Sequence, residues 1–113
     1  MPLKIVLLTA ILLIGYSAML AAKTEPEVII IPVEGTVEPG LAAYVKRALK
    51  QFEDRDEGLI VFKLDTFGGR VDAALDIVDT ISNIPKMKTI AYVDKRAISA
   101  GALIALSAGE LYM

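Results

Sequence analysis

The sequence predicts an α/β domain: a parallel sheet with crossover helices in the order β-α-β-α-β-α, preceded by an apolar leader. Two observations indicate this fold class. Strand-like runs rich in β-branched residues alternate three times with stretches of helical periodicity. Each strand-like run is also followed by a short loop that contains glycine or leads to a serine. Alternation of this kind favours parallel strands joined by right-handed crossovers.

Residues 1–23 are predicted to be a signal peptide or a membrane anchor. No charged residue occurs between Ile5 and Ala22, and a lysine precedes this run. Small residues in its second half favour a cleaved signal peptide, whereas its length is just sufficient for a membrane anchor. Either interpretation places the domain of residues 24–113 at the membrane or outside the cell, on the extracytoplasmic side.

The first β-α unit follows the leader. Residues 28–33 form a continuous apolar run, which predicts a strand with both faces buried, as in parallel sheets. Residues 34–40 are predicted to be a loop, in which Pro39 is placed to begin a helix. Apolar residues then recur at helical spacing, with basic residues on the opposite side. These apolar residues are Leu41, Tyr44, Val45, Ala48, Leu49 and Phe52.

The second unit repeats the first in kind. Residues 59–64 are predicted to be a strand, residues 65–70 a loop and residues 71–81 a helix that ends before Pro85. The apolar side of that helix is predicted to consist of Val71, Ala74, Leu75, Val78 and Ile81.

The third unit ends in a helix without a polar side. Residues 89–93 are predicted to be a strand, and the helix that starts at Ser99 carries no charged residue before Glu110. A helix of this composition is expected to be buried on every side. Residues 110–113 predict the start of a fourth strand, and we expect the chain to be a fragment truncated at its C-terminal end.

Three candidate site segments follow three different strands. Ligands of open α/β sheets bind outside the carboxyl ends of the strands. Gly35, the pair Gly68-Gly69 and Ser99 all fall at such ends, so we expect them to converge. The local sequence leaves two interpretations of Ser99 open, a helix N-cap and a residue that helps to stabilise an oxyanion. The glycine pair similarly predicts either a tight turn or a backbone site for a carbonyl oxygen.

Composition excludes several classes of function. The chain has no Cys and no His, which excludes thiolate chemistry and the common zinc and Ser-His-Asp sites. A net charge of −2 without a basic stripe does not indicate nucleic-acid binding. Neither a dinucleotide fingerprint nor a phosphate-binding loop occurs, so no cofactor is expected. Asp72, Asp76 and Asp79 are interpreted as a solvated helix face and not as metal ligands, and Lys95 as an exposed charge and not as a base.

Three ordered motifs resemble a known family. They are Glu-Gly-Thr-Val-Glu-Pro-Gly at 34–40, Leu-Asp-Thr-Phe-Gly-Gly-Arg-Val at 64–71 and Ala-Ile-Ser-Ala-Gly-Ala at 97–102. In order and spacing they resemble the N-terminal domain of NfeD-type membrane serine peptidases, the ClpP-like group associated with stomatins. The resemblance covers residues 28–113 and implies a ClpP/crotonase-like fold that uses a Ser-Lys dyad.

The resemblance also implies roles for individual residues. Ser99 matches the nucleophile, the N–H groups of Gly69 and Ala100 match the oxyanion hole, and Gly68 shapes the turn. The family's lysine base comes after the position of Met113, so the fragment itself is expected to be inactive. Two positions depart from the family pattern. They are Phe67, where proline is usual, and Ile98, where a small residue is common.

The function implied is that of a serine endopeptidase cleaving apolar peptide segments. The resemblance further implies a stomatin/SPFH-type membrane partner and a homo-oligomer when the domain is complete. Two alternatives remain. One is a non-catalytic scaffold that binds a stomatin-like partner, and the other is a crotonase-like acyl-CoA enzyme.

Overall fold

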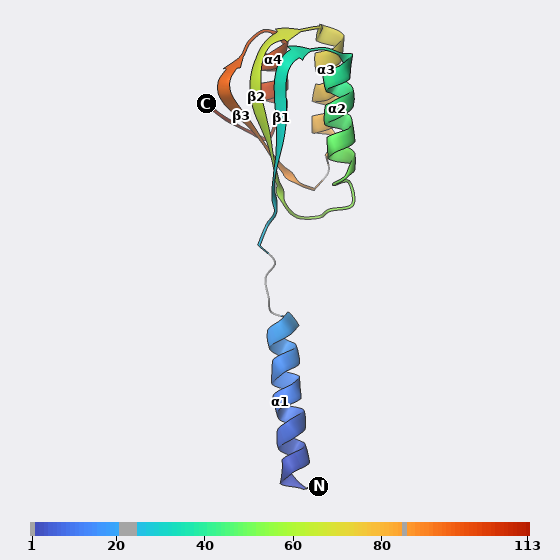
Figure 1. Cartoon of the computed structure of the whole chain (residues 1–113), viewed down its shortest axis with the longest axis vertical. Coiled ribbons are helices and arrows are strands. Elements are labelled where there is room, and N and C mark those ends of the chain that lie inside the picture. The colour runs from blue at the N-terminus through green and yellow to red at the C-terminus, as the bar shows by residue number, and fades with distance from the viewer. Residues whose placement is uncertain (1, 21–24, 85) are drawn as a thin grey trace.

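The computed structural model describes residues 2–20, 25–84 and 86–113 (Figure 1). Along the chain its elements are α1 (Leu3–Leu20), β1 (Val28–Val37), α2 (Pro39–Lys50), β2 (Leu59–Gly69), α3 (Val71–Ser82), β3 (Lys88–Ala97), α4 (Ala100–Ser107) and β4 (Glu110–Tyr112). The predicted boundary at residues 23–24, the small residues at 21–22 and the helix stop at Pro85 lie outside the described residues.

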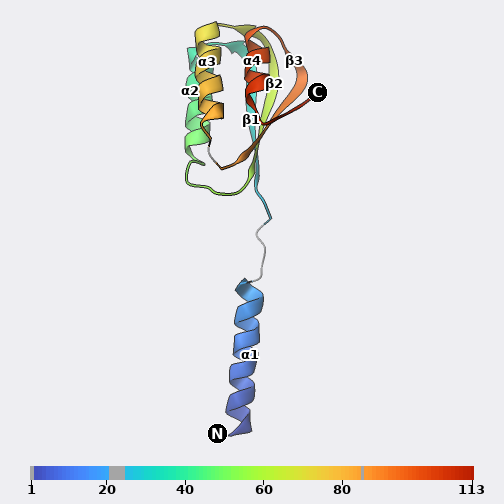
Figure 2. The same cartoon turned by 180° about the vertical axis from the view of Figure 1, so that it is seen from behind.

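The sheet is parallel throughout and has the strand order β1-β2-β3-β4. The predicted α/β class and the predicted fourth strand are therefore confirmed. Each crossover leads to the next strand in the same direction, so right-handed connections place the helices on one face of the sheet. Figures 1 and 2 show α2, α3 and α4 on that face from opposite sides of the molecule.

The core lies between this helix layer and the sheet. Phe62, Leu64 and Ile60 project from β2 and are fully buried, against Ile77 of α3 and Ile104 of α4. Burying a side chain of this size contributes about 1.5–3 kcal/mol. The central strand β2 thus supplies the largest buried side chains, and its carboxyl end is held firmly by the core.

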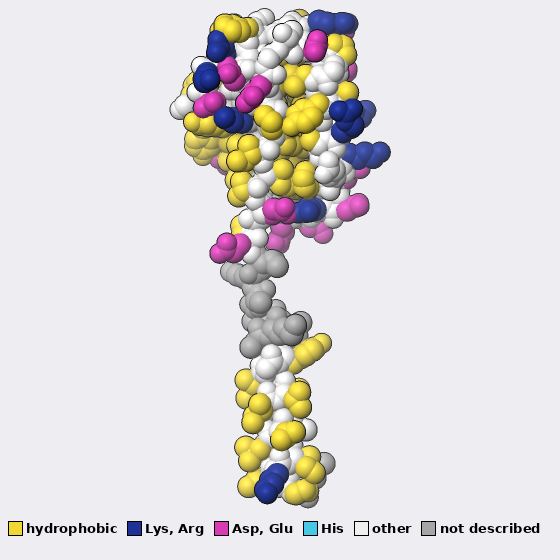
Figure 3. All heavy atoms as spheres, in the orientation of Figure 1, with side chains coloured by type: hydrophobic (Ala, Val, Ile, Leu, Met, Phe, Trp, Pro, Cys, Tyr) yellow, Lys and Arg dark blue, Asp and Glu magenta, His cyan; other side chains and the backbone are white. Residues whose placement is uncertain are grey.

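The expectation that the first strand is buried on both faces is wrong. Ile31 and Val33 face the core, but Val28 and Ile30 on the other side of β1 are 57% and 63% exposed. Figure 3 shows apolar side chains on this side of the domain. The reason is topological, since a sheet whose strands follow each other in order receives all its helices on one face.

The helix faces also differ from those predicted. Val71 and Leu75 of α3 are exposed, whereas Ala73 and Ile77 are buried. The reason is that α3 contacts both α2 and α4, and its alanines permit close approach to them. In α4, which was expected to be buried all round, Leu106 is 72% exposed because the helices form a single layer on one face of the sheet (Figure 1).

The strands run further than predicted. β1 and β2 stay paired up to Val37 and Gly69, and β2 and β3 stay paired up to Thr66 and Ala97. Most of the predicted loops at 34–40 and 65–70 is therefore strand. This extension carries the sheet up to the residues of the candidate site.

The described side chains of α1 are exposed along residues 3–17. Among the helices of the described residues, none is both long and apolar enough to cross a membrane.

Candidate active site

The three predicted strand-end segments meet at Thr66, which is 1% exposed. Its hydroxyl donates to the Gly35 carbonyl at 2.5 Å and accepts the Gly68 N–H at 3.0 Å. Its own carbonyl accepts the Ile98 N–H at 3.1 Å. The expected convergence of the segments around Gly35, Gly68 and Ser99 is thus confirmed. Thr66 itself was missed, although its place among the inward-facing positions of β2 could have indicated a buried hydroxyl.

Both strand pairings lose register at this level. In the β1–β2 pair the shift lies between Glu34 and Thr36, and in the β2–β3 pair it lies between Leu64 and Asp65. In the second pair Leu64 is opposite Val93 but Asp65 is opposite Arg96, so two residues of β3 are bulged out. Bulges bend a strand and redirect its side chains. Here the extra residue of the first pair lies on β2, and the extra residues of the second pair lie on β3.

Ser99 occupies the N-cap position of α4 in a strained conformation. Its φ of 56° and ψ of −120° lie outside the regions that residues with a Cβ ordinarily adopt. Within the described part of the chain, its side chain makes no capping hydrogen bond to α4. The interpretation of the hydroxyl as an N-cap is therefore wrong. A serine on a sharp, strained strand-to-helix turn exposes its hydroxyl, as nucleophiles on such turns do.

Gly68 lies directly against this turn. Its φ is +103°, and a Cβ on it would lie 2.7 Å from the Ile98 carbonyl oxygen and 2.9 Å from Ser99 Cβ. No side chain fits in that space. Because the Gly68 N–H is bonded to Thr66, this residue contributes backbone shape and not a free donor.

The N–H groups at the start of α4 differ in whether an acceptor is found for them among the described residues. The N–H groups of Gly101 and Ala102 donate to the carbonyls of Ile98 and Ser99, at 3.0 and 2.9 Å. Among the described residues, no hydrogen-bond acceptor is assigned to the Ala100 N–H. Ala100 N would lie 3.2 Å from a Cβ on Gly68, so it sits over the glycine turn. A free N–H at the positive end of a helix can bind an anionic oxygen.

Position 69 has to be glycine because the neighbouring strand β1 leaves no space for a side chain. A Cβ on Gly69 would overlap the backbone of Val37, whose carbonyl accepts the Arg70 N–H at 2.8 Å. Close approach of β1 therefore fixes the backbone at the end of β2, one residue after Gly68.

Charged groups surround the strand ends. Arg96 Nε donates to Asp65 Oδ1 at 2.7 Å, and the Arg96 guanidinium carbon lies 4.1 Å from the centre of the Phe67 ring. Lys95 Nζ lies 3.9 Å from Asp65 Oδ2, and the lysine side chain is 66% exposed.

The predicted solvated face of α3 is confirmed, since Asp72, Asp76 and Asp79 are all exposed. Asp72 accepts two hydrogen bonds from the Arg70 guanidinium and one from the Ala73 N–H. The pairing with Arg70, helped by the Ala73 N–H, lowers the pKa of Asp72. These hydrogen bonds of Asp72 hold the first turn of α3, which begins directly after the glycine pair and Arg70.

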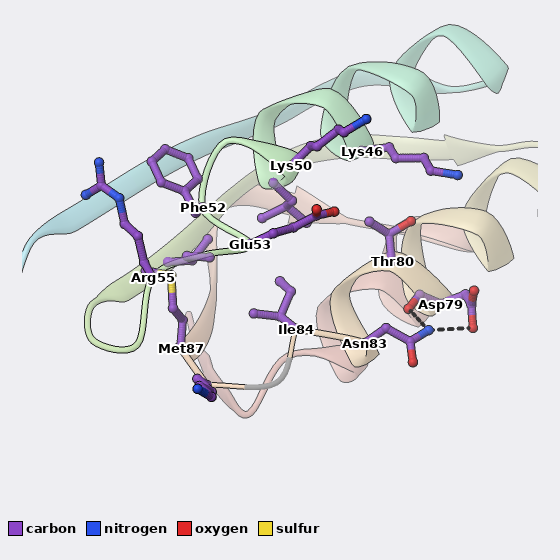
Figure 4. A pocket seen from close by; sticks show the side chains of 13 residues that line it. Lys46, Lys50, Phe52, Glu53, Arg55, Asp79, Thr80, Asn83, Ile84 and Met87 are labelled. Atoms are coloured by element: carbon purple, nitrogen blue, oxygen red, sulfur yellow. Dashed lines mark hydrogen bonds between the residues drawn. The ribbon is translucent and has the colours of Figure 1, made fainter.

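A separate pocket of about 230 Å³ lies at the other end of the sheet, where the strands begin (Figure 4). Its apolar floor includes Ile60 and Met87, and both cations and carboxylates line it. Asn83 on its rim is bonded to Asp79 at 2.9 and 3.2 Å. None of the predicted site residues lines this pocket.

Comparison with known proteins identifies the family. The model of the NfeD1b N-terminal domain matches residues 27–113. The chain belongs to the NfeD1b family. It is 42% identical over 108 residues to the membrane protein NfeD1b of Bacillus subtilis (strain 168). That match includes 95% of this chain but 24% of the Bacillus protein, so the chain spans about a quarter of that relative's length.

Solved structures agree with this assignment. A 1510-N membrane protease specific for a stomatin homolog, from Pyrococcus horikoshii, is 30% identical with a TM-score of 0.68, covering 78% of this chain and 45% of the other. A 1510-N mutant solved with a substrate peptide is 28% identical with a TM-score of 0.68, covering 79% and 42%. ClpP1 from Listeria monocytogenes is 26% identical with a TM-score of 0.59, covering 74% and 54%. The NfeD1b domain therefore has a ClpP-like protease fold.

Proposed function

We propose that this chain is part of the serine endopeptidase domain of a membrane-associated NfeD/ClpP-class protease, with Ser99 as the nucleophile. The observation that carries the proposal is the strained turn of Ser99 against Gly68, beside the Ala100 N–H, for which no acceptor is found among the described residues. Strain of this kind persists only where the surrounding structure enforces it, and it gathers at functional sites. The likeness to 1510-N and ClpP1 supports a protease function for this turn.

In the proposed reaction the Ser99 hydroxyl attacks the carbonyl carbon of a peptide bond. The proton passes from the hydroxyl to a neutral lysine. The negatively charged oxygen of the tetrahedral intermediate accepts hydrogen bonds from the N–H groups of Gly69 and Ala100. Collapse of the intermediate breaks the C–N bond, and the leaving amine takes the proton from the lysine. Water then hydrolyses the ester on Ser99 by the same steps.

The base is proposed to come from residues after Met113. A lysine that acts as a base has to be shielded from water. Lys95, four residues before Ser99, has a side chain that is 66% exposed and faces Asp65, which argues against this role. We therefore expect residues 24–113 alone to show no Ser99-dependent peptide hydrolysis, and measurable hydrolysis would contradict the assignment of the base.

The proposed substrate is an apolar peptide segment, and the proposed source is a stomatin-type membrane protein. The 1510-N relative is named for specificity toward a stomatin homolog, and the Bacillus relative is named a membrane protein. The apolar, exposed α1 is proposed to deliver the domain to the extracytoplasmic side of the membrane as part of a signal peptide. A homo-oligomer of the complete domain is part of the same proposal.

Labelling with a fluorophosphonate tests the nucleophile. In the full-length protein we expect Ser99-dependent labelling that is lost in Ser99→Ala. Ser107→Ala is the matched control, because Ser107 lies at the end of α4 and donates to the Ile104 carbonyl. Equal labelling of the parent and Ser99→Ala would count against Ser99. Binding of a stomatin-type protein without any labelling would favour the scaffold instead, and binding of an acyl-CoA would favour a crotonase-like enzyme.

A further inference from the structure

Two large apolar side chains stand exposed immediately beside the Ser99 turn. Phe67 is 69% exposed and Ile98 is 50% exposed, and they directly precede Gly68 and Ser99 in the sequence. Thr66 pairs with Ala97 in the sheet, and the next residues along the chain are Phe67, within β2, and Ile98, directly after the end of β3. Since side chains alternate along a strand and Thr66 is buried on the core side, Phe67 leaves the sheet on the face that carries no helix.

The Phe67 ring is held in place although it is exposed. It stacks on the guanidinium of Arg96, 4.1 Å from the ring centre, and Arg96 is fixed by its hydrogen bond to Asp65 at 2.7 Å. A cation over an aromatic face stabilises this arrangement. The ring is therefore pre-ordered, so a ligand that contacts it loses little further side-chain entropy.

We propose that Phe67, with Ile98 beside it, is the specificity-determining contact for a large apolar side chain of the substrate next to the scissile bond. This inference rests on the proposed function of Ser99. A peptide whose carbonyl lies over Ser99 and Ala100 passes the end of β2, because Gly68 is in contact with both residues. Phe67 is the first side chain of β2 that such a peptide meets, because Gly68 and Gly69 have none. An apolar side chain of the peptide that packs on the exposed ring removes apolar surface of both groups from water, which favours binding. A small polar side chain does not provide this contribution.

Arg96 acts in this arrangement as a positioning residue. Its guanidinium stacks on the Phe67 ring, and Asp65 fixes its Nε atom. Arg96→Lys keeps the positive charge and loses the planar stack and the directed Nε bond. It is therefore expected to act in the same direction as Phe67→Ala, with a smaller effect.

Peptide binding tests the inference without turnover. In full-length protein carrying Ser99→Ala, fluorescence anisotropy is measured with two labelled peptides that differ only in a central Leu or Gly. Phe67→Ala is expected to raise the Kd of the Leu peptide about tenfold and to leave that of the Gly peptide unchanged. Phe67→Leu should recover most of the difference. Leu75→Ala, which removes an exposed apolar side chain of α3 on the helix-bearing side of the sheet, is the matched control.

The outcomes separate this inference from the proposed function. Equal affinity of the parent and Phe67→Ala for the Leu peptide would overturn it, and so would an equal loss for both peptides or the absence of peptide binding. If labelling depends on Ser99 but peptide preference does not depend on Phe67, the nucleophile stands and the specificity contact fails. If preference depends on Phe67 but labelling does not depend on Ser99, the contact stands and the proposed reaction fails.

Discussion

Gly68 and Ser99 are so close that a Cβ on the glycine would lie 2.9 Å from the Cβ of the serine. They come from different β-α units, 31 residues apart in the sequence, and their contact joins the end of β2 to the start of α4. The shape of the Ser99 turn is therefore set by a strand that does not contain it. Substitutions at the end of β2 should therefore alter the backbone conformation of Ser99.

Gly68→Ala tests this dependence. An added methyl group would meet the Ile98 carbonyl and Ser99, and alanine would also have to adopt a φ near +103°. We expect a loss of about 1–3 kcal/mol in unfolding free energy and loss of Ser99 labelling. Urea denaturation measures the first effect. Gly40→Ala is the control, because a Cβ there would lie 3.7 Å from the nearest atom, and a similar loss in that variant would contradict the explanation.

Thr66→Val removes the hydroxyl that links the Gly35 carbonyl to the Gly68 N–H and keeps the side-chain shape. The Gly68 N–H and the Gly35 carbonyl would both lose their partner. Burying an unsatisfied polar group costs about 1–3 kcal/mol, and we expect this loss in urea denaturation. The backbone amide signal of Gly68 should also shift in NMR spectra.

Thr66→Ser is the companion variant. It keeps the hydroxyl but removes Cγ2, which packs so closely on Gly101 that a Cβ there would lie 2.5 Å away. Loss of one buried methyl group is expected to cost about 0.5–1.5 kcal/mol. A Thr66→Val variant as stable as the parent, beside a destabilised Thr66→Ser, would mean that packing, and not hydrogen bonding, explains the role of Thr66.

The fold and the convergence of the site segments could be predicted because both follow from element order. Three strand-helix alternations imply parallel strands, and parallel strands bring their carboxyl ends to one edge. Gly68 and Ser99 stood out as residues suited to a turn and a helix start. Their positions in the sequence were therefore enough to place them at the same edge.

The details of the site depend on contacts between distant residues, which local patterns do not record. Val28 and Ile30 are as apolar as Ile31 and Val33, so their composition does not show which face the helices leave open. The positive φ of Ser99 occurs at its contact with Gly68, a residue that lies far away in the sequence. Thr66 is a common strand residue, and its role became visible only through its bonds to Gly35 and Gly68.

The Arg70–Asp72 pair predicts a pH-dependent contribution to stability. Hydrogen bonding to Arg70 lowers the pKa of Asp72 in the folded state below that of the unfolded chain, which is about 3.9. The pair therefore stabilises the fold above that pH, and its contribution is lost as the pH falls through the folded-state pKa. Asp72→Asn should be less stable than the parent at pH 7, and the difference should vanish in strongly acidic solution.

Urea denaturation of both proteins from pH 2 to 7 measures this difference. Both side chains are 62% exposed, so the effect should be small and should shrink at high salt. Asp76→Asn, further along the exposed side of α3, is the control. A difference between the parent and Asp72→Asn that stays constant across this pH range would show that charge does not cause it.

Ser99→Gly separates stability from function at the same position. Glycine adopts a φ of 56° and a ψ of −120° without the steric cost that a Cβ imposes. A residue held in a sparsely populated region costs of order 1–3 kcal/mol, so Ser99→Gly should be more stable than the parent by about this amount, while labelling is abolished. Ser99→Ala should lose labelling without this gain, because alanine keeps the Cβ. Thermal and urea unfolding of the parent, Ser99→Gly and Ser99→Ala measure the ranking.

Ser107→Gly, at the end of α4, is the control and should be less stable than the parent, because glycine is unfavourable in a helix. If Ser99→Gly proved no more stable than Ser99→Ala, the turn would carry no strain, and the main argument for Ser99 as the nucleophile would be lost.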